Sequence, residues 1–202
     1  MPKSDLLLAT SSSGKLREWQ ALLADLPLRL LTLRDQDITF DVDETGTTYV
    51  ENALLKADAY GTASGLLTLA EDAGLNVSAL GGSPGVHSAR WQGSDYANKN
   101  ALLVRLLAGK HGAERACRYV CAVVLRHPDG RHWRVRGEVR GQIATEPAGA
   151  GGFGYDPIFY IPRLRQTLAQ VSVDEKDRVS HRSRAAGRIR PILRHLIEAG
   201  AP

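Results

Sequence analysis

The pattern of apolar and polar positions singles out residues 66–75 as the segment around which the chain is organised. An apolar run of strand length ends there in two adjacent carboxylates, Glu71 and Asp72. Ligands of α/β sheets bind outside the carboxyl ends of strands, so these acids predict a site. Two like charges ~4 Å apart cost about 4 kcal/mol at an effective dielectric of about 20, and Mg²⁺, which prefers oxygen ligands, would remove that cost. A plain polar turn is an equally good interpretation of these residues alone.

Apolar spacing in the first part of the chain predicts strands and helices in alternation. Residues 5–10 are typical of a short buried strand. The next stretch predicts a helix that ends before Pro27, and its apolar stripe comprises Leu16, Trp19, Leu23 and Leu26. Residues 29–40 predict a less regular strand and loop. Thr48 and Glu51 form a capping box, so a second helix is expected to begin there.

The second half of the chain is richer in strand patterns. Residues 75–80 alternate like a separate strand, and a glycine-rich loop over 81–90 follows. An amphipathic helix is predicted over 96–107. Alternation on both sides of a Pro-Asp-Gly turn at 128–130 predicts a β-hairpin, whose strands cover residues 117–126 and 132–140.

Glycine is concentrated in the segment 147–162. Glycines around Phe153 and Asp156 let the backbone approach a ligand closely, although a mobile surface turn has a similar composition. Ser172 and Glu175 predict another capping box, with Lys176 directly after it.

The last predicted helix opens after Ser180, and Pro191 inside it predicts a kink or a break. Strands and helices alternate along the chain with a hairpin inserted, and the sequence has no internal repeat, linker or low-complexity segment. We therefore expect a single domain over residues 1–202, of the α/β class with a mixed sheet.

Composition narrows the choice of function. The chain has 202 residues, enough for one sizeable core or two lobes, and a formal charge of +4, which allows nucleic acid, a membrane surface or a small phosphorylated substrate as partner. Cys117 and Cys121 lie about 13 Å apart along an extended strand and cannot bridge. We expect them to be buried and reduced, as in a cytoplasmic protein. No apolar run has the length needed to cross a bilayer.

The turn after the first predicted strand has the composition of an anion site. The amide groups and the dipole of the helix that starts there would face this turn, which comprises Thr10, Ser11, Ser12, Ser13, Gly14 and Lys15. It is not a Walker A loop, because Ala9 and Leu16 stand where that motif needs Gly and Ser or Thr. Serines that only cap the helix are the alternative.

The polar candidates fall into three kinds. The carboxylates are Glu44, Glu71 and Asp72. The cations are Lys15, Lys56, Lys176 and Arg182. A nucleobase could stack on Phe153 and meet hydrogen-bonding groups at Asp156, His181 and Arg182. Together these groups are what a metal-bound nucleoside triphosphate requires.

Five ordered blocks carry a resemblance to a known family. They are Ala9-Thr-Ser-Ser-Ser-Gly-Lys15, Glu44-Thr-Gly with Glu51-Asn-Ala-Leu-Leu-Lys56, Glu71-Asp-Ala-Gly-Leu75 with Gly82-Ser-Pro-Gly-Val-His-Ser-Ala-Arg90, Gly151-Gly-Phe-Gly-Tyr-Asp-Pro157, and Glu175-Lys176 with Ser180-His-Arg182. In this order the blocks resemble the inosine triphosphate pyrophosphatase family, the RdgB-type enzymes that hydrolyse dITP and XTP. Each block alone is weak, but the ordered set is specific and spans residues 9–182.

The resemblance implies an α/β fold with a central twisted mixed sheet, flanking helices and two lobes around a cleft. It implies a homodimer, and Mg²⁺-dependent hydrolysis of ITP, dITP and XTP to the monophosphate and pyrophosphate. Asp72 would be the general base and a metal ligand, with Glu44 and Glu71 as further metal ligands. The implied substrate-binding residues are Thr10, Ser11, Ser12, Ser13, Gly14, Lys15, Lys56, Ala73, Phe153, Gly154, Tyr155, Asp156, Lys176, His181 and Arg182.

Three positions depart from the family's pattern. The family usually has asparagine where Ser12 stands, aspartate where Glu71 stands and serine where Ala73 stands. Ser12 keeps a shorter hydrogen-bonding group, Glu71 moves its charge by one methylene, and Ala73 offers only its backbone. These changes bear on geometry and affinity, whereas the reaction class stays the same.

Two other functions compete with this interpretation. A Maf-like nucleotide pyrophosphatase would share the phosphate chemistry but prefer other bases. A basic nucleic-acid-binding module would explain the charge and the arginines of segment 182–194, but those arginines lack interleaved aromatic residues on which bases could stack. We therefore expect a nucleoside triphosphate as partner, and neither nucleic acid nor a membrane.

Overall fold

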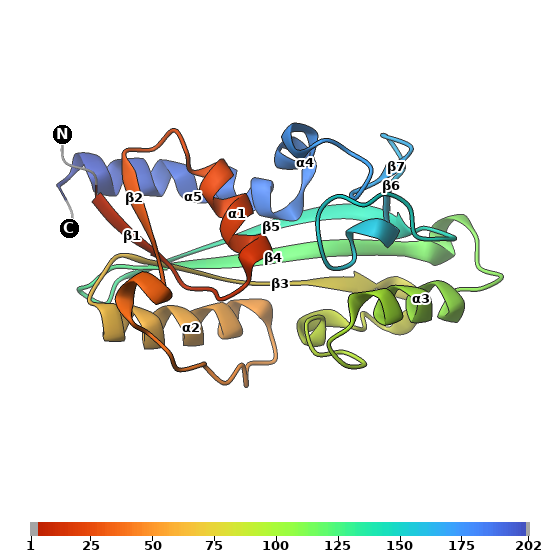
Figure 1. The fold of residues 1–202 in the computed structure, drawn as a ribbon, viewed down its shortest axis with the longest axis horizontal. Helices are drawn as coiled ribbons and strands as arrows, with labels where there is room; N and C mark the ends of the chain where they lie inside the picture. The colour runs from red at the N-terminus through yellow and green to blue at the C-terminus, as the bar shows by residue number, and fades with distance from the viewer. Residues whose placement is uncertain (1–3, 201–202) are drawn as a thin grey trace. The chain divides into compact units, whose positions relative to one another are not determined.

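The computed structural model describes residues 4–200 and has an α/β fold. Within that range the sheet has seven strands in the order β2-β1-β3-β4-β5-β6-β7 (Figure 1). The strands are β1 (Ser4–Leu8), β2 (Leu28–Thr32), β3 (Thr68–Val77), β4 (Ala116–Arg126), β5 (His132–Ile143), β6 (Phe159–Ile161) and β7 (Gln166–Thr167). β1 pairs in parallel with β2 and β3, and β6 pairs antiparallel with β5 and β7, which confirms the mixed sheet.

The α-helices begin close to the predicted positions, but α1 ends at Leu22, before the end predicted at Pro27. They are α1 (Ser13–Leu22), α2 (Tyr49–Ser64), α3 (Tyr96–Leu106), α4 (Val173–Val179) and α5 (His181–Glu198). Short 3₁₀ turns are η1 (Arg34–Gln36), η2 (Ser78–Leu80), η3 (Gly85–His87), η4 (Gly112–Arg115) and η5 (Asp156–Ile158). In the part of the chain that the structure covers, no helix is both long and apolar enough to cross a bilayer.

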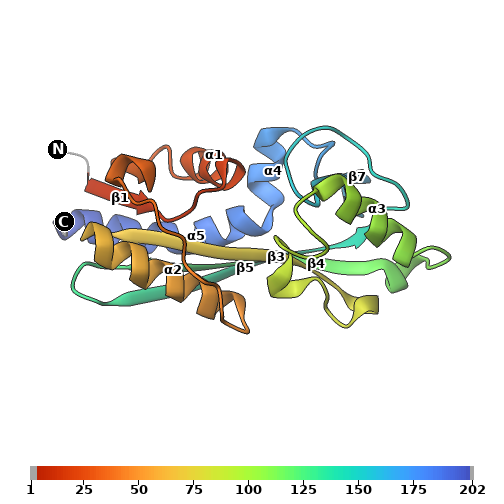
Figure 2. The same ribbon diagram turned by 60° about the horizontal axis from the view of Figure 1, so that its bottom comes forward.

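Residues 4–200 form two compact units. Unit 1 contains residues 4–72, 121–137 and 182–200, and unit 2 contains residues 73–120 and 138–181. In unit 1, α2 covers one face of the sheet, and α1 and α5 lie on the other (Figure 1). Figure 2 shows the same arrangement with α2 in front of β3. Side chains of Leu7, Ala53, Ala57 and Val124 form the core under α2.

Local hydrogen bonds explain where the helices of unit 1 begin. The Ser12 hydroxyl accepts from the Lys15 amide at 3.5 Å and so caps α1. At α2 the Thr48 hydroxyl accepts from the Glu51 amide while the Glu51 carboxylate accepts from the Thr48 amide, which confirms the predicted capping box. α2 ends at Gly65, whose φ of 68° suits the left-handed conformation that glycine adopts without strain.

The central segment differs from the prediction. Glu71 and Asp72 do not end a strand, because β3 continues through them to Val77. Residues 75–80 form no separate strand: they complete β3 and then enter η2. Consecutive side chains of a strand point to opposite faces of the sheet, so the two acids do not face one another. A metal ion between them is therefore not what relieves their repulsion.

Unit 2 is built on a separate core. Its members come from β3, β4, β5, α3, η5 and β6, and they include Leu75, Leu103, Tyr119, Val139 and Phe159. The turn between β4 and β5 is closed by the His127 amide donating to Arg131 O and the Gly130 amide to His127 O, and β4 and β5 are neighbours in the sheet, as the hairpin prediction requires.

Three further expectations meet a mixed outcome. Ser172 caps α4 by accepting from the Glu175 amide at 3.2 Å. Of the kink or break predicted at Pro191, the break does not occur, since α5 runs through this residue. The Pro191 ring lacks an amide hydrogen, so α5 gives up one backbone bond there without ending. Cys117 and Cys121 are buried and free, as predicted.

Candidate active site

Glu71 points to the face of β3 that α1 and α5 cover, and it is saturated with donors. Oε2 accepts from Trp19 Nε1 at 2.7 Å and from Arg182 Nε at 2.7 Å, and Oε1 accepts from Arg182 Nη2 at 2.7 Å. Lys15 Nζ lies 3.2 Å from Oε1. Arg182, at the start of α5, also donates through Nη1 to Glu18 on α1.

The Glu71–Arg182 pair at the centre of this cluster is almost entirely removed from water. Glu71 and Arg182 are each 1% exposed. Burial alone would raise the pKa of Glu71, but Arg182 and Lys15 outweigh burial and hold that pKa well below its usual value. Glu71 therefore carries a full negative charge whose two oxygens are both engaged, which leaves little capacity for the metal-ligand role expected from the sequence.

Asp72 points to the opposite face, toward α2. Its Oδ2 accepts from Asn52 Nδ2 at 3.2 Å, and its Oδ1 lies 3.8 Å from Lys56 Nζ. Lys56 also donates to Glu44 Oε1. Burial raises the pKa of Asp72, and the nearby Glu44 carboxylate adds to this, although Lys56, Lys15 and Asn52 oppose it. Asp72 is thus a buried carboxylate with a raised affinity for a proton.

The residues around Asp72 suit a hard divalent cation. Within residues 4–200 no three His, Cys, Asp or Glu side chains converge as a complete metal cage. Mg²⁺ does not need one, since it usually takes one or two protein carboxylates together with substrate phosphates and water. Glu44 and Asp72 supply two carboxylates that both contact the Lys56 ammonium, which offsets their charge in the free protein. The donor set fits the metal.

The predicted phosphate turn lies between β1 and the first turn of α1. The Ser12 amide donates to Thr10 Oγ1 at 3.2 Å, while Ser11 and Ser13 are exposed and Gly14 is buried. The Ser12 hydroxyl is already used as the helix cap, so the interpretation of this serine as a cap is correct. Capping and anion binding are compatible, because the amides of the first helical turn remain directed at the turn.

The glycine-rich segment of unit 2 is held by a buried ion pair. Asp156 Oδ2 accepts from the Phe153 amide at 2.8 Å and from Lys176 Nζ at 2.5 Å. Lys176 Nζ lies 5.1 Å from the centroid of the Phe153 ring. Gly152 has a φ of 68°, and a Cβ there would lie 2.1 Å from Asp156 Oδ2. Only glycine lets the loop close on this ion pair.

Stacked rings support the rest of this segment. The His181 ring lies over the Tyr119 ring, with centroids 4.4 Å apart and an interplanar angle of 14°. The Tyr119 hydroxyl accepts from the Tyr155 amide at 3.1 Å, and the Tyr155 hydroxyl donates to Ser88 O at 2.8 Å. Asn100 Nδ2 donates to Gly154 O at 3.1 Å. The residues of the predicted base slot that lie in unit 2 are therefore held by hydrogen bonds, an ion pair or a stacked ring.

The structure thus gathers the predicted residues in two groups. Unit 1 brings together Lys15, Glu44, Lys56, Glu71, Asp72 and Arg182 with the Thr10–Gly14 turn. Unit 2 contains Phe153, Gly154, Tyr155, Asp156, Lys176 and His181. Ala73, a half-buried residue of β3, is also assigned to unit 2.

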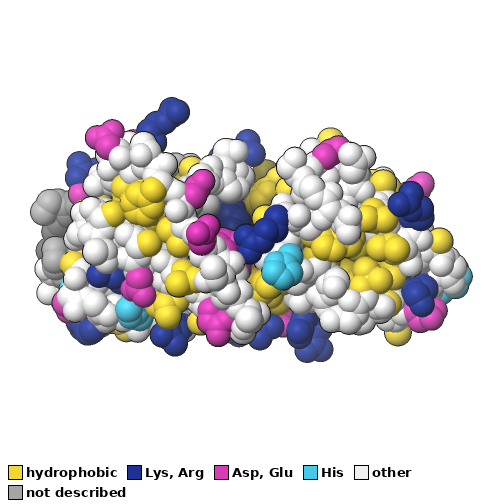
Figure 3. Space-filling model, turned by 90° about the horizontal axis from the view of Figure 1, so that it is seen from below, with side chains coloured by type: hydrophobic (Ala, Val, Ile, Leu, Met, Phe, Trp, Pro, Cys, Tyr) yellow, Lys and Arg dark blue, Asp and Glu magenta, His cyan; other side chains and the backbone are white. Residues whose placement is uncertain are grey.

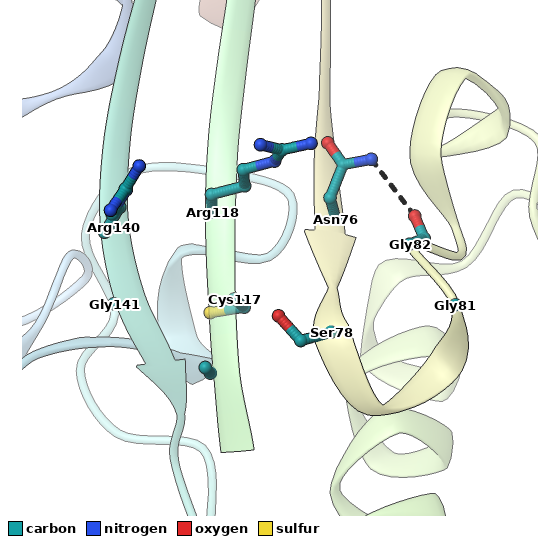
Figure 4. Close-up of a pocket in the computed structure, with 9 residues that line it drawn as sticks. Asn76, Ser78, Gly81, Gly82, Cys117, Arg118, Arg140 and Gly141 are labelled. Atoms are coloured by element: carbon teal, nitrogen blue, oxygen red, sulfur yellow. Dashed lines mark hydrogen bonds between the residues drawn. The ribbon is translucent and has the colours of Figure 1, made fainter. Parts of the chain in front are cut away.

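Unit 2 also has a pocket of about 530 Å³ that contains none of the predicted site residues (Figure 4). Asn76, Arg118 and Arg140 line it from three strands, and Asn76 Nδ2 donates to Gly82 O at 3.1 Å. Both arginines pair with Glu138. Their charge is therefore partly neutralised, and the pocket carries no part of the function assigned below.

Sequence reasoning missed several residues that complete the site. Asn52 and Glu18 were not singled out, although each lies one helical turn from a predicted residue. Asn52 precedes Lys56 by four positions and Glu18 follows Lys15 by three, spacings that place both side chains on the same helix face. Trp19 was expected only in the core, yet its indole N–H donates to Glu71.

With this geometry established, comparison with known proteins identifies the family. A sequence model of the Ham1 family matches residues 6–192. The chain belongs to the Ham1 family. A curated dITP/XTP pyrophosphatase of Symbiobacterium thermophilum is 47% identical over 201 residues, 99% of this chain and 100% of that protein. One from Thermus thermophilus is 45% identical and covers 96% of this chain and 90% of its own.

Solved structures agree with this membership. A Ham1 protein from Coxiella burnetii superposes with a TM-score of 0.86 at 35% identity, covering 95% of this chain and 99% of that one. The Ham1 protein of Staphylococcus aureus gives a TM-score of 0.84 at 34% identity, with the same coverage of 95% and 99%. Both the resemblance inferred from five sequence blocks and the α/β class are confirmed.

Proposed function

We propose that this Ham1-family chain hydrolyses deaminated purine nucleoside triphosphates, namely ITP, dITP and XTP, to the monophosphate and pyrophosphate, and so cleanses the nucleotide pool. The observation that carries the proposal is the buried, proton-attracting carboxylate of Asp72 beside Lys56 and Glu44. The dITP/XTP pyrophosphatases at 47% and 45% identity support the same reaction class.

Glu44 and Asp72 would hold the Mg²⁺ ion. When bound, the metal supplies charge that stabilises the phosphate oxygens as the anhydride bond breaks. Glu71, expected from the sequence as a further ligand, has both oxygens occupied by Trp19, Arg182 and Lys15, so we assign the metal to the other two acids. Lys56 then provides a cation for the phosphates once it is released from Asp72 and Glu44.

Asp72 would act as the general base. Asn52 fixes its Oδ2, and Oδ1 is left on the side of Lys56. A carboxylate whose pKa is raised by burial is better matched to removing a proton from water near neutral pH than an ordinary aspartate. The proton of the attacking water would pass to the Asp72 carboxylate, and pyrophosphate would leave from the α-phosphorus.

The remaining residues would bind the nucleotide. The Thr10–Lys15 turn would bind phosphates through helix amides and the Lys15 ammonium. Phe153, Gly154, Tyr155 and Asp156 would enclose the base, with Lys176 contacting the substrate and Ala73 offering its backbone. His181 and Arg182 would recognise the 6-oxo group. The basic charge of the chain would then serve a small nucleotide instead of nucleic acid or a membrane surface.

A substrate panel tests the reaction. Pyrophosphate release is measured from ITP, XTP, GTP, ATP and dTTP, with and without Mg²⁺, using inorganic pyrophosphatase to convert the product into detectable phosphate. We expect a large preference for ITP and XTP and a strict metal requirement. Comparable turnover of ATP would refute the base preference, and preference for dTTP would favour the Maf-like alternative. Salt-sensitive shifts of labelled DNA without any turnover would favour the nucleic-acid-binding module.

We further propose that the chain acts as a homodimer in the cytoplasm. Hydrophobic side chains gather on the face seen in Figure 3 over the part of unit 2 that contains α3. Leu106, the last residue of that helix, is 46% exposed. Contiguous exposed apolar surface of this kind favours association. Both cysteines are free thiols, which suits a reducing compartment. Light scattering after size-exclusion chromatography should give twice the chain mass of 21.9 kDa, and a monomer at micromolar concentration would contradict the proposal.

A further inference from the structure

The side chain of Asn52, on α2, makes one contact with each of the two regions that hold the proposed metal ligands. Its Nδ2 donates to Asp72 Oδ2 at 3.2 Å, and its Oδ1 accepts from the Gly46 amide at 2.8 Å. Gly46 lies two residues after Glu44 in the loop that precedes α2. A single amide group therefore ties the loop of one acid to the carboxylate of the other.

This amide is fixed more firmly than a surface asparagine would be. Asn52 is 0% exposed, so neither of its hydrogen bonds can be exchanged for water without disturbing the packing. It sits in the first turn of α2, whose capping box sets the position of the helix start. The two bonds also assign the amide: the nitrogen must face the acceptor Asp72, and the oxygen must face the donor Gly46.

The contact at Gly46 is too close for any other residue. A Cβ at Gly46 would lie 2.7 Å from Asn52 Oδ1 and 2.6 Å from Glu51 Cβ. The glycine is therefore required by the approach of the loop to α2, and the loop cannot carry Glu44 at its present place unless this approach is kept. The sequence Glu44-Thr-Gly46 and the asparagine act as one structural element.

We propose that Asn52 is a positioning residue, which holds Glu44 and Asp72 at the separation that a divalent cation requires. This inference rests on the proposed function, in which those two acids hold the metal. Residues that orient metal ligands without touching the metal commonly change metal affinity about 10–100-fold when removed. Asn52 touches no group assigned to the phosphates or the nucleobase, so its loss should act on the metal before it acts on the nucleotide.

The test compares three variants of the full chain. Asn52→Ala removes both hydrogen bonds, and Gly46→Ala displaces the loop while leaving the asparagine in the sequence. Tyr60→Phe is the matched control, because the Tyr60 hydroxyl donates at 3.4 Å to Phe40 O, in the same segment before α2, from two turns further along the same helix. Mn²⁺ alone is titrated by electron paramagnetic resonance, and kcat and KM for ITP are measured at saturating Mg²⁺. Circular dichroism establishes that each variant is folded.

We expect Asn52→Ala and Gly46→Ala to weaken Mn²⁺ binding about tenfold, with the KM for ITP within about twofold and Tyr60→Phe unchanged. Mn²⁺ binding within about twofold of wild type in a folded Asn52→Ala variant would overturn the proposal. So would an equal loss in Tyr60→Phe, because that result indicates general loosening of α2. If Asn52→Ala does not fold, Gly46→Ala decides alone. A wild-type chain that neither binds Mn²⁺ nor needs Mg²⁺ would instead refute the proposed function, which separates the two failures.

Discussion

Glu71 and Asp72 are neighbours on β3, yet their surroundings shift their pKa values in opposite directions. Glu71 faces α1 and α5 and accepts from Arg182 and Trp19 with Lys15 beside it, and these cations hold its pKa well below the usual value. Asp72 faces α2, where burial and the Glu44 carboxylate raise its pKa although Lys56, 3.8 Å away, opposes the rise. The charge of one carboxylate is compensated by neighbouring cations, whereas the other has a raised affinity for a proton.

This difference suggests that Glu71 contributes to stability, whereas Asp72 serves the proposed reaction. A buried charge that is fully paired holds its partners in place and gains nothing from a ligand. A buried charge that is incompletely paired costs stability in the free protein and is relieved when a cation or a proton arrives. Removing each carboxylate should therefore have opposite consequences for folding and for turnover.

The largest effect is expected for Asp72→Asn. Loss of a general base lowers the rate by roughly 10²–10⁴, and loss of a metal ligand adds to this, so kcat for ITP should fall to near background. The fold should survive, because the introduced amide keeps an oxygen that can accept from Asn52 Nδ2. Steady-state kinetics and thermal unfolding measure the two effects. Asp43→Asn, an exposed acid in the same loop as Glu44, is the control, and a kcat for Asp72→Asn within about threefold of wild type would contradict the assignment.

Glu71→Gln should destabilise the protein strongly. Breaking a buried ion pair by removing one partner leaves an uncompensated charge and typically costs about 3–5 kcal/mol, here mainly because Arg182 would lose the carboxylate that binds its Nε and Nη2. Urea unfolding at neutral pH measures the change. Glu71→Asp, which keeps the charge one methylene shorter, should lose less. A loss below about 1 kcal/mol for Glu71→Gln would show that Glu71 does not hold the cluster.

Lys56→Met should have a smaller effect, and it should strengthen metal binding instead of weakening it. The Lys56 ammonium contacts Glu44 and Asp72 and so competes with a metal ion in the free protein. Like charges near ~4 Å repel by about 4 kcal/mol at an effective dielectric of about 20, and a flexible lysine can avoid part of this by moving. We expect Mn²⁺ binding without nucleotide to tighten about tenfold, since about 1.4 kcal/mol of the repulsion would suffice.

The control for that variant is Lys110→Met, which removes a partly exposed lysine 3.8 Å from Glu114. Its Mn²⁺ affinity should not change. Weaker Mn²⁺ binding by Lys56→Met would mean that the lysine orders the acids more than it repels the metal. Asn52→Ala and Lys56→Met thus predict opposite changes in one measured constant, although both residues contact Asp72.

The elements that the sequence predicted correctly are those whose cause is local. The capping box at Thr48, the hairpin turn at 128–130 and the start of α5 all depend on residues within a few positions. The five motif blocks were enough to identify the family, because the identification depends only on which residue types occur and in which order. The local pattern also predicted Asp72, Glu44 and Lys56 as site residues, and the structure brings these three together.

The errors have a common physical cause: the charge of a buried residue is compensated by a partner that lies far along the chain. Two adjacent acids looked like the end of a strand, since a charged residue is rarely buried in a strand unless it is paired. Glu71 is paired, but its partner Arg182 lies 111 positions away, and the carboxylate of Glu18 reaches Arg182 across 164 positions. No spacing within a window reveals such partners. The alternation rule alone could have shown that Glu71 and Asp72 face opposite ways within a continuous strand.

The pH dependence of stability tests the contrast between Glu71 and Asp72 through the smallest of the expected effects. The pKa of Glu71 lies well below its ordinary value of 4.5, so its contribution is full above about pH 4.5 and is lost as the pH falls through the folded value. The pKa of Asp72 is raised above 3.8, so its favourable contribution is present below that value and is lost as the pH rises through the folded one.

Relative to wild type, Glu71→Gln should therefore become less unstable as the pH falls below about 4.5, while Asp72→Asn should become more stable as the pH rises above about 4. The sign of each change is the prediction, because the pKa of Glu71 is lowered and that of Asp72 is raised on folding. Urea unfolding of the three proteins between about pH 3.5 and 7 measures these changes. Differences of the same sign at neutral pH would mean that the two faces of β3 treat a carboxylate alike, and the division between a structural and a reactive acid would then be wrong.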